Sequence, residues 1–207
     1  MFGNLERPNL GIEVMSIKSV CEKITDGTHQ TPTYSEKGYM FLSSKDVKTG
    51  HIDWGNIRYI SQELHSELSR RVSPRRNDIL LAKNGTTGIA ALVETDQIFD
   101  IYVSLALLRP KQDINPIYLL SAINNDMTKR QFDAGLKGIG VPNLHLNVIN
   151  QVKILVAPID LQNRFADFVK QADKSKFAAL QQTKIATVLY NTIKGGFVSA
   201  LRKLRFT

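Results

Sequence analysis

The chain has 207 residues, of which 43% are hydrophobic and 22% are charged, and this is the composition of an ordinary globular protein. Its apolar runs are far shorter than the roughly 18 residues that a membrane helix needs, and its first residues lack the basic-then-apolar pattern of a secretory signal. The single cysteine, Cys21, excludes an internal disulfide and a cysteine-based zinc site, and it fits a cytoplasmic location.

The net charge of +8 is concentrated toward the C-terminal end of the chain. Residues 174–207 contain seven Lys and Arg and no Asp or Glu, whereas the preceding residues contain 20 basic and 19 acidic side chains. Two explanations for this basic C-terminal segment remain equally open. Cations near the end of a helix complement its dipole, and a basic segment also attracts a phosphate backbone or an acidic protein.

The first third of the chain is predicted to form a connector, short strands and short helices. Residues 1–13 contain glycine and proline and are typical of a connector. Residues 16–23 are a candidate helix, and Ser61 is placed to cap another helix over residues 61–71. Strands are predicted over residues 39–42 and 57–60, the second of them after a turn at residues 50–53.

The middle of the chain is richer in strands. Residues 74–77 are predicted to form a turn in which Asn77 tolerates positive φ. Three strands are predicted over residues 79–82, 89–93 and 101–108. Pro116 suits a first helical position, which predicts a helix over residues 116–134. A glycine-rich loop at residues 136–146 and a segment ending in a strand, residues 148–156, follow. Strands and helices are mixed without regular βαβ alternation, so we expect an α+β domain.

One long helix is predicted over residues 158–196. Asp160 would cap its start, Gly195 and Gly196 would end it, and no Pro or Gly lies between them. About 35 residues rising ~1.5 Å each make a rod of roughly 50 Å. Apolar residues spaced alternately by three and four form a coiled-coil-type seam, and its members are Phe165, Phe168, Ala172, Ala179, Ala186, Leu189 and Ile193.

A rod of this kind is not expected to be stable alone. We therefore expect the helix to pair with a similar helix from another chain or from a missing half, and a helix folded back over its own domain is the remaining alternative. The predicted organisation is a globular domain of residues 1–157 followed by a pairing helix and basic tail of residues 158–207.

The chain lacks the common catalytic motifs. It has no phosphate-binding P-loop, no dinucleotide fingerprint in the right context, no zinc-binding histidine pair and no hydrolase nucleophile elbow. The triplet Asp46-Val47-Lys48 resembles the D-x-K of nucleases in which two carboxylates hold Mg²⁺, and Asp26 or Glu36 could supply the second carboxylate. Because a three-residue match is weak, a solvated loop is the favoured explanation, and we predict neither a catalytic residue nor a metal site.

Three polar loops that contain glycine are better candidates for function. They are the first loop (residues 26–30), the second loop (83–88) and the third loop (137–145). Each one alone is more often an ordinary surface turn, but together with a basic cluster at residues 70–76 they favour a nucleic-acid interface. The predicted DNA-binding residues are Thr28, His29, Gln30, Arg75, Arg76, Lys83, Asn84, Thr86, Thr87, Lys137, Asn143 and His145.

The order of these segments resembles the DNA-specificity subunit of type I restriction-modification systems over nearly the whole chain. ITDGTH and GYMFLSSKDVKTGHID resemble the start of that family's target-recognition domain, and RRNDILLAKNGTTG resembles its strand-loop-strand, with Asn77 where the family usually has Gly. GLKGIGVPNLHLNVI resembles the loop before its last strand. ILVAPIDLQNRFADFVKQADKSK resembles the start of its spacer helix, with Pro158 and Gln162 of a P-x-x-x-Q pattern in place.

The resemblance implies a non-catalytic protein that recognises one half of a bipartite DNA target. Full subunits of the family carry two recognition domains and two antiparallel spacer helices, so this chain is similar to one half. The implied partners are double-stranded DNA, a methyltransferase (modification) subunit that holds S-adenosylmethionine, a restriction subunit, and a second copy or another specificity half, with no cofactor in this chain itself. The alternatives are a Mg²⁺-dependent nuclease using Asp46 and Lys48, and a helical adaptor that binds only protein.

Overall fold

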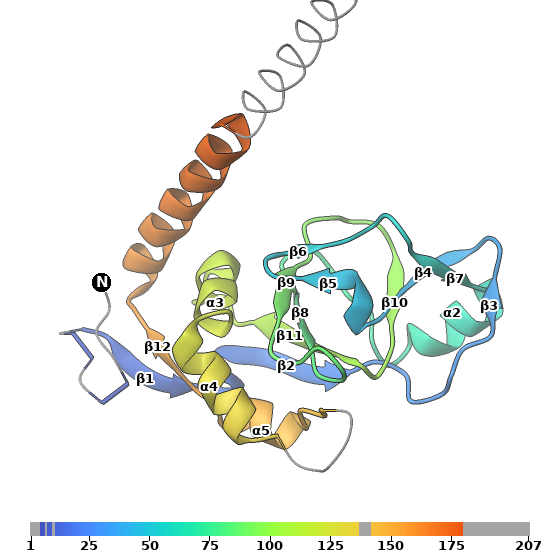
Figure 1. The fold of residues 1–207 in the computed structure, drawn as a ribbon, viewed down its shortest axis with the longest axis horizontal. Helices are drawn as coiled ribbons and strands as arrows, with labels where there is room; N and C mark the ends of the chain where they lie inside the picture. Colours follow the sequence, from blue (N-terminus) through green and yellow to red (C-terminus); the bar gives the residue numbers. More distant parts are fainter. Residues whose placement is uncertain (1–4, 7, 10, 137–141, 180–207) are drawn as a thin grey trace, which may run out of the picture. The chain divides into compact units, whose positions relative to one another are not determined.

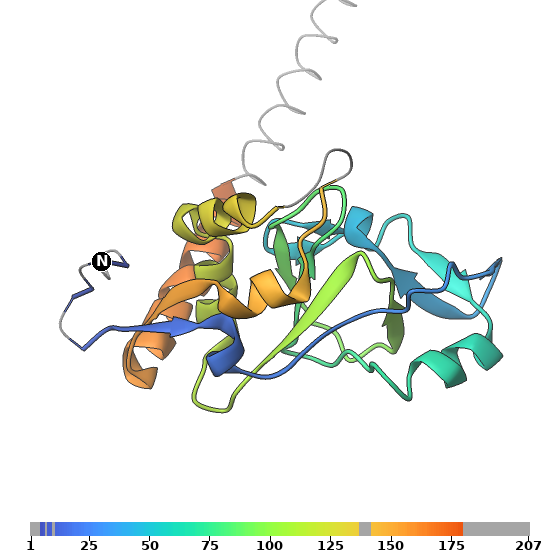
Figure 2. The same ribbon diagram turned by 90° about the horizontal axis from the view of Figure 1, so that it is seen from below.

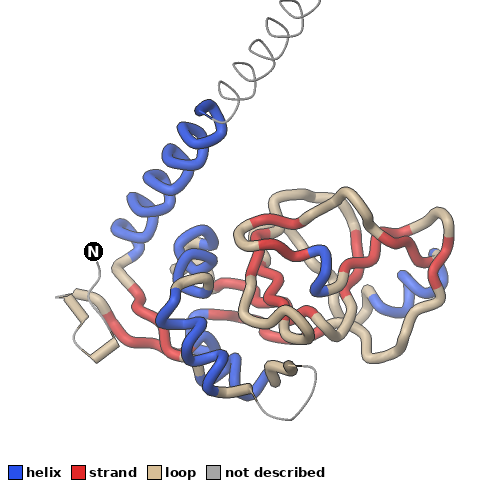
Figure 3. The backbone as a smooth tube through the Cα atoms, viewed as in Figure 1, coloured by secondary structure: helices blue, strands red, loops and turns tan. Residues whose placement is uncertain are grey.

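The computed structural model describes residues 5–6, 8–9, 11–136 and 142–179, and its contacts divide the chain into a unit of Met1–Arg164 and a unit of Phe165–Thr207. The first unit mixes strands and helices, which confirms the predicted α+β class (Figures 1 and 3). None of the helices among these residues is long and apolar enough to cross a membrane.

A four-stranded antiparallel sheet forms the centre of the first unit. Its strands, in spatial order, are β2 (Cys21–Asp26), β11 (Leu105–Pro110), β8 (Ile79–Ala82) and β9 (Ala90–Leu92). Successive side chains of a strand point to opposite faces, so Ile79 and Leu81 join one apolar cluster while Leu80 and Ala82 join another. Both faces of the sheet are therefore buried, which explains why its strands are continuous apolar runs.

Short helices and a two-stranded sheet cover one face of the central sheet (Figures 1 and 2). The buried side chains Ile17, Leu119, Phe132 and Ile149 pack from four helices onto this face in the first cluster. The elements are α1 (Ile17–Val20), α3 (Pro116–Ile123), α4 (Asp126–Ala134), α5 (Leu146–Gln151), and β1 (Glu13–Ser16) paired antiparallel with β12 (Lys153–Val156).

A second sheet covers the other face. Leu42, Phe99 and Ile101 pack from it against Leu80 and Leu107 of the central sheet. Its strands, in spatial order, are β10 (Phe99–Ile101), β4 (Tyr39–Leu42), β7 (Arg58–Ile60) and β3 (Tyr34–Ser35), of which β10 and β4 are parallel. The 3-10 turn η1 (Ser44–Asp46), the hairpin β5 (Val47–Lys48)–β6 (His51–Ile52) and helix α2 (Gln62–Leu68) complete this layer.

Several local predictions are confirmed. Strands occupy residues 39–42 and 79–82 as expected. Ser61 caps α2 by accepting a hydrogen bond from the backbone N–H of Leu64 at 3.3 Å. Asn77 adopts φ of 73°, the left-handed conformation that Gly or Asn accepts most easily.

Two predicted elements are broken by contacts with distant segments. The strand expected at residues 101–108 is two strands, because Tyr102 turns away and donates its backbone N–H to the carbonyl of Leu42 at 2.8 Å. The helix expected at residues 116–134 ends at Ile123, where the side chain of Asn124 pairs with the backbone N–H and C=O of Ala90 on the edge strand β9. Asn125 then caps α4.

Other predictions missed or misplaced an element. The helix expected at residues 16–23 ends at Val20 because Cys21 begins β2, which pairs with β11. Residues 51–52 form strand β6 within the segment predicted as a turn. The N-terminal connector was predicted over residues 1–13, but Glu13 already begins β1. Helix α5 was not predicted.

The predicted cap of the C-terminal helix is wrong. The helix begins at residue 159, so Asp160 already lies inside it, and the carbonyl of Pro158 accepts the N–H groups of Leu161 and Gln162. The helix continues through residue 179, the last one described. Its predicted end at Gly195 and Gly196, and the seam residues Ala186, Leu189 and Ile193, lie outside the described residues.

Gln162 ties the first turn of this helix to the segment before α3. Its side chain is 1% exposed, and its Oε1 accepts the backbone N–H of Asn115 at 2.9 Å. Its Nε2 donates to the carbonyls of Ala157 at 2.8 Å and Asp113 at 3.5 Å. The P-x-x-x-Q pattern therefore has a physical basis, since a buried amide satisfies backbone groups from two segments at once.

Replacing Gln162 with Leu is expected to lower the free energy of unfolding by about 2–4 kcal/mol, because buried backbone groups of Asn115 and Ala157 would lose their partners. Urea unfolding of the full chain measures the change. The matched control is Asn163→Ala, which removes one exposed hydrogen bond to Asn115 and should cost under about 1 kcal/mol. Equal stability of both variants would contradict the role of Gln162.

Candidate nucleic-acid interface

The second loop lies beside residues 142–145, the described part of the third loop. The carbonyl of Lys83 accepts the N–H of Leu144 at 2.7 Å, and the N–H of Gly85 donates to the carbonyl of Pro142 at 3.1 Å. Asn84 and Asn143 face each other in an antiparallel bridge between these segments. Two loops that are about 55 residues apart in sequence thus share one backbone frame.

The first loop is fixed to the turn between β10 and β11. Thr28 donates its N–H to Ile101 at 3.1 Å and accepts the N–H of Val103 at 2.9 Å, while Lys83 donates its N–H to Ser104 at 2.9 Å in the same turn. A side chain at Gly27 would collide with the carbonyl oxygen of Ile101. Glycine is therefore required at position 27 by the chain's own backbone.

Asp26 is the charged centre around which these segments meet. Its buried carboxylate lies 2.8 Å from Nη2 of Arg71, 3.4 Å from Nζ of Lys83 and 3.4 Å from Nε2 of His29. The Arg71 guanidinium also donates to the carbonyl of Gly27 at 3.2 Å. From the sequence alone, Asp26 stands out only as the start of a loop and as a possible metal ligand, because nothing local indicates its three basic partners.

Lys83 is buried, unlike its neighbours in the second loop. Its side chain is only 7% exposed and faces Asp26. Gly85 and Thr86 are exposed, and Asn84 and Thr87 are partly exposed. In the other two loops, His29, Gln30 and His145 are exposed, Thr28 and Asn143 are partly exposed, and Lys137 lies outside the described residues.

The predicted basic cluster is divided between the two ends of β8. Arg71 reaches the first loop through Asp26, but Arg75 and Arg76 precede β8, at the end opposite the second loop. Arg75 lies 2.7 Å from Glu22, and Arg76 binds Asp96 through two nitrogens. The hydrogen bond from Arg76 lowers the pKa of the exposed Asp96 carboxyl. Exposed ion pairs of this kind contribute little to stability and can exchange partners.

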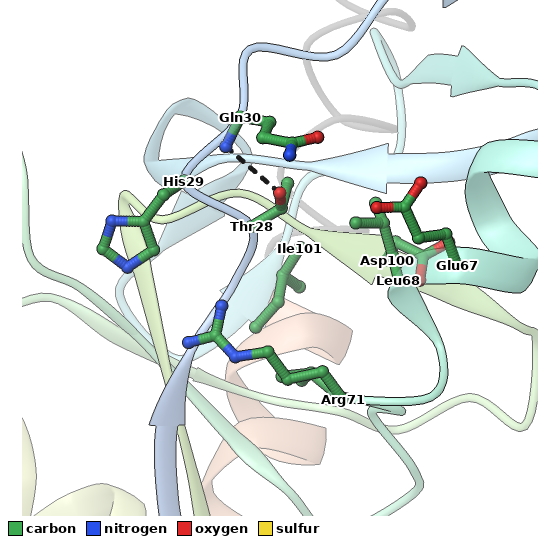
Figure 4. A pocket seen from close by; sticks show the side chains of 9 residues that line it. Thr28, His29, Gln30, Glu67, Leu68, Arg71, Asp100 and Ile101 are labelled. Atoms are coloured by element: carbon green, nitrogen blue, oxygen red, sulfur yellow. Dashed lines mark hydrogen bonds between the residues drawn. The ribbon is translucent and has the colours of Figure 1, made fainter.

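A cavity of about 330 Å³ lies between the first loop and the end of α2 (Figure 4). Arg71 and Asp100 also line it. The buried Asp100 lies 2.7 Å from Nδ1 of His65, whose ring stacks on Tyr39 at 3.7 Å between centroids. Burial raises the pKa of Asp100, and its hydrogen bond with His65 acts in the opposite direction. This pair anchors α2 beneath the first loop.

A second, larger cavity of about 670 Å³ adjoins the second loop. It is bordered by η1, by the segment 53–58 and by Asn84 and Gly85. Its basic residues are Lys45, Lys48 and Arg58. The sequence gives no sign of this cavity, because the triplet at residues 46–48 and the second loop, which both border it, lie in separate segments of the chain.

The Asp46-Val47-Lys48 triplet has a structural role. Oδ2 of Asp46 accepts the N–H and the hydroxyl of Ser43 at 2.7 and 3.0 Å, which caps η1, and Nζ of Lys48 donates to the carbonyl of Lys45 at 2.8 Å. Within the described ranges, no three His, Cys, Asp or Glu side chains gather as a metal site. The nuclease alternative therefore finds no support in this part of the chain.

The chain matches a model of the type I restriction modification DNA specificity domain over residues 9–190. No curated protein matches it significantly. Three solved structures share the fold at identities too low to show more than the fold. One, from a study of complex assembly and conformational transition of the type I R-M system, is 19% identical with a TM-score of 0.62, and the match covers 87% of this chain and 43% of that one.

The other two structures are S subunits. The HsdS subunit from Thermoanaerobacter tengcongensis is 17% identical with a TM-score of 0.58, covering 83% of this chain and 40% of that one. The type I restriction-modification S subunit from M. genitalium is 14% identical with a TM-score of 0.57, covering 80% and 40%. The chain thus spans less than half the length of the solved chains that it matches.

Replacing Lys83 with Met is expected to lower the free energy of unfolding by about 1–3 kcal/mol, because the buried Asp26 would lose one of its cations. Thermal or urea unfolding measures the effect. Lys129→Met removes the same charge from an exposed position on α4 and should leave stability within about 0.5 kcal/mol. If the two variants unfold alike, Lys83 does not hold the loops together.

Proposed function

Because the chain belongs to the type I restriction modification DNA specificity family, we propose that it recognises one half of a bipartite double-stranded DNA target. The observation that carries this proposal is the convergence of the first loop, the second loop and residues 142–145 on one edge of the central sheet. Loops that present exposed threonine, glutamine and histidine side chains on a rigid frame suit direct contacts with base edges.

The proposed contacts are the exposed or partly exposed residues of the three loops. Thr86 and His145 come from the paired second and third loops, and His29 and Gln30 come from the first loop. Arg75 and Arg76 are proposed to exchange their exposed carboxylate partners for DNA phosphates. Lys83 is proposed to act indirectly, by holding the second loop against Asp26.

The C-terminal helix is proposed to act as a spacer that pairs with a second copy or with another specificity half. Phe168 on the predicted seam is 67% exposed, which supports an apolar pairing surface. Under this proposal residues 1–157 recognise DNA and residues 158–207 set the distance between half-sites. The chain would be non-catalytic and would scaffold a methyltransferase subunit, which holds S-adenosylmethionine, and a restriction subunit.

Replacing His29 with Ala is expected to weaken binding to the target duplex by about 5- to 150-fold, the effect of losing one base contact. The target is first selected from a pool of random duplexes by the full-length chain, and the affinity is then measured by fluorescence anisotropy. His51→Ala removes an exposed histidine from β6 and serves as the matched control.

The affinity of the wild-type chain for DNA should depend on salt. With five or six phosphates neutralised, the logarithm of the binding constant should fall against the logarithm of the salt concentration with a slope of roughly −5. A flat salt response would indicate an adaptor that binds only protein.

Replacing Phe168 with Glu is expected to weaken self-association by at least about 100-fold, because two copies would each lose a buried aromatic side chain. Phe177 is similarly exposed but lies nine residues further, on the opposite side of the helix, so Phe177→Glu is the matched control. Sedimentation velocity measures the self-association of both variants. Retention of the dimer by the Phe168 variant would exclude pairing through the predicted seam.

A further inference from the structure

Arg58 borders the larger cavity and differs from Arg71, Arg75 and Arg76 in the basic cluster. Arg71, Arg75 and Arg76 each lie within ion-pair distance of a carboxylate. Arg58 is exposed and has neither an ion pair nor a side-chain hydrogen bond to any residue that the structure describes. Its donors are therefore available to a ligand in the cavity of about 670 Å³ that it lines.

The guanidinium of Arg58 lies over an aromatic ring. Its Cζ lies 4.5 Å from the ring centroid of Tyr34, and that ring packs edge-on against the buried Phe41 at 6.1 Å. Tyr34 pairs with Ile60 across strands β3 and β7, so Arg58, two residues along β7, projects from the same face. Stacking on a ring fixes the guanidinium plane while leaving the N–H donors at its edge free.

The walls of this cavity favour a neutral ligand edge over a phosphate. Asp46 and Asp53 line it beside the cations Lys45, Lys48 and Arg58, and the two carboxylates would repel a bound phosphate. Ser44, Asn56 and Asn84 add groups that both donate and accept. A mixed lining of this kind matches the edge of a base, and a flat guanidinium fork matches the two acceptors of guanine, O6 and N7.

We infer that the cavity between η1, the segment 53–58 and the second loop is a base-recognition subsite in which Arg58, stacked on Tyr34, donates to O6 and N7 of a guanine in the major groove. This inference rests on the proposed recognition of DNA and adds a named base and a named residue to it. Because Asn84 and Gly85 line the same cavity, the subsite adjoins the second loop.

The test is selection from a pool of random duplexes by the full-length chain, followed by sequencing of the bound fraction. The wild-type consensus should contain a G·C pair whose preference falls at least about 10-fold in Arg58→Lys, because lysine keeps the charge but lacks the bidentate fork. Tyr34→Ala should weaken the same preference, and Tyr34→Phe should retain it because the ring remains. Arg130→Lys, at an exposed position on α4, is the matched control and should leave the consensus unchanged.

Three results would overturn the inference. A consensus that is unchanged in Arg58→Lys and Arg58→Ala would show that Arg58 recognises no base, while the proposed function would stand. Uniform weakening of all sequences by Arg58→Ala, with recovery in Arg58→Lys, would assign Arg58 to a phosphate. If the wild-type chain enriches no sequence, both the proposed function and the proposed subsite are wrong.

Discussion

The burial of both faces of the central sheet is the constraint on which the rest of the structure depends. β2 and β8 both pair antiparallel with β11, so they run in the same direction and end at the same edge of the sheet. Asp26 ends β2 opposite Ala106, and Ala82 ends β8 opposite Leu105. The first and second loops therefore start at the same edge, on either side of β11. A one-residue shift in register would move the apolar side chains out of both cores, so this arrangement is fixed.

Two buried carboxylates hold opposite ends of this sheet. Asp26 meets Arg71 and Lys83 where the loops begin. Asp78, at the start of β8, accepts two hydrogen bonds at 2.7 Å from Arg109 of β11. A carboxylate that is removed from water must be paired, and removing one partner of such a pair is strongly destabilising. These cations thus stabilise the fold, and Arg58 and the exposed loop residues remain available for binding.

Local features could be predicted from sequence, whereas features that depend on distant contacts could not. The turn at Asn77 and the cap at Ser61 follow from the chemistry of single residues. The end of α3 depends on Asn124 reaching Ala90, which is 34 residues away. A lysine is seldom buried, so its sequence context gives no sign that Lys83 faces Asp26.

The candidate site shows the same division between local features, which the sequence predicts, and features that depend on distant contacts. The three loops were recognisable from their glycines and polar side chains, but the pairing of Asn84 with Asn143 depends on tertiary structure. The stack of Arg58 on Tyr34 joins residues from two strands with no shared motif, so sequence alone could not reveal it. The basic cluster was inferred from sequence proximity, yet a strand of four residues spans roughly 13 Å and separates Arg75 from the second loop.

The frame of the loops consists of backbone hydrogen bonds, and this separates stability from specificity. Thr28 bonds to Ile101, and Gly85 bonds to Pro142, through main-chain groups alone. Replacing an exposed side chain such as Thr86 leaves these bonds in place, so its identity can change while the loop keeps its position. The same fold can then present different side chains to the proposed DNA target, while the constraint falls on Gly27, on Asp26 with its buried partner Lys83, and on the buried strands that fix where the loops begin.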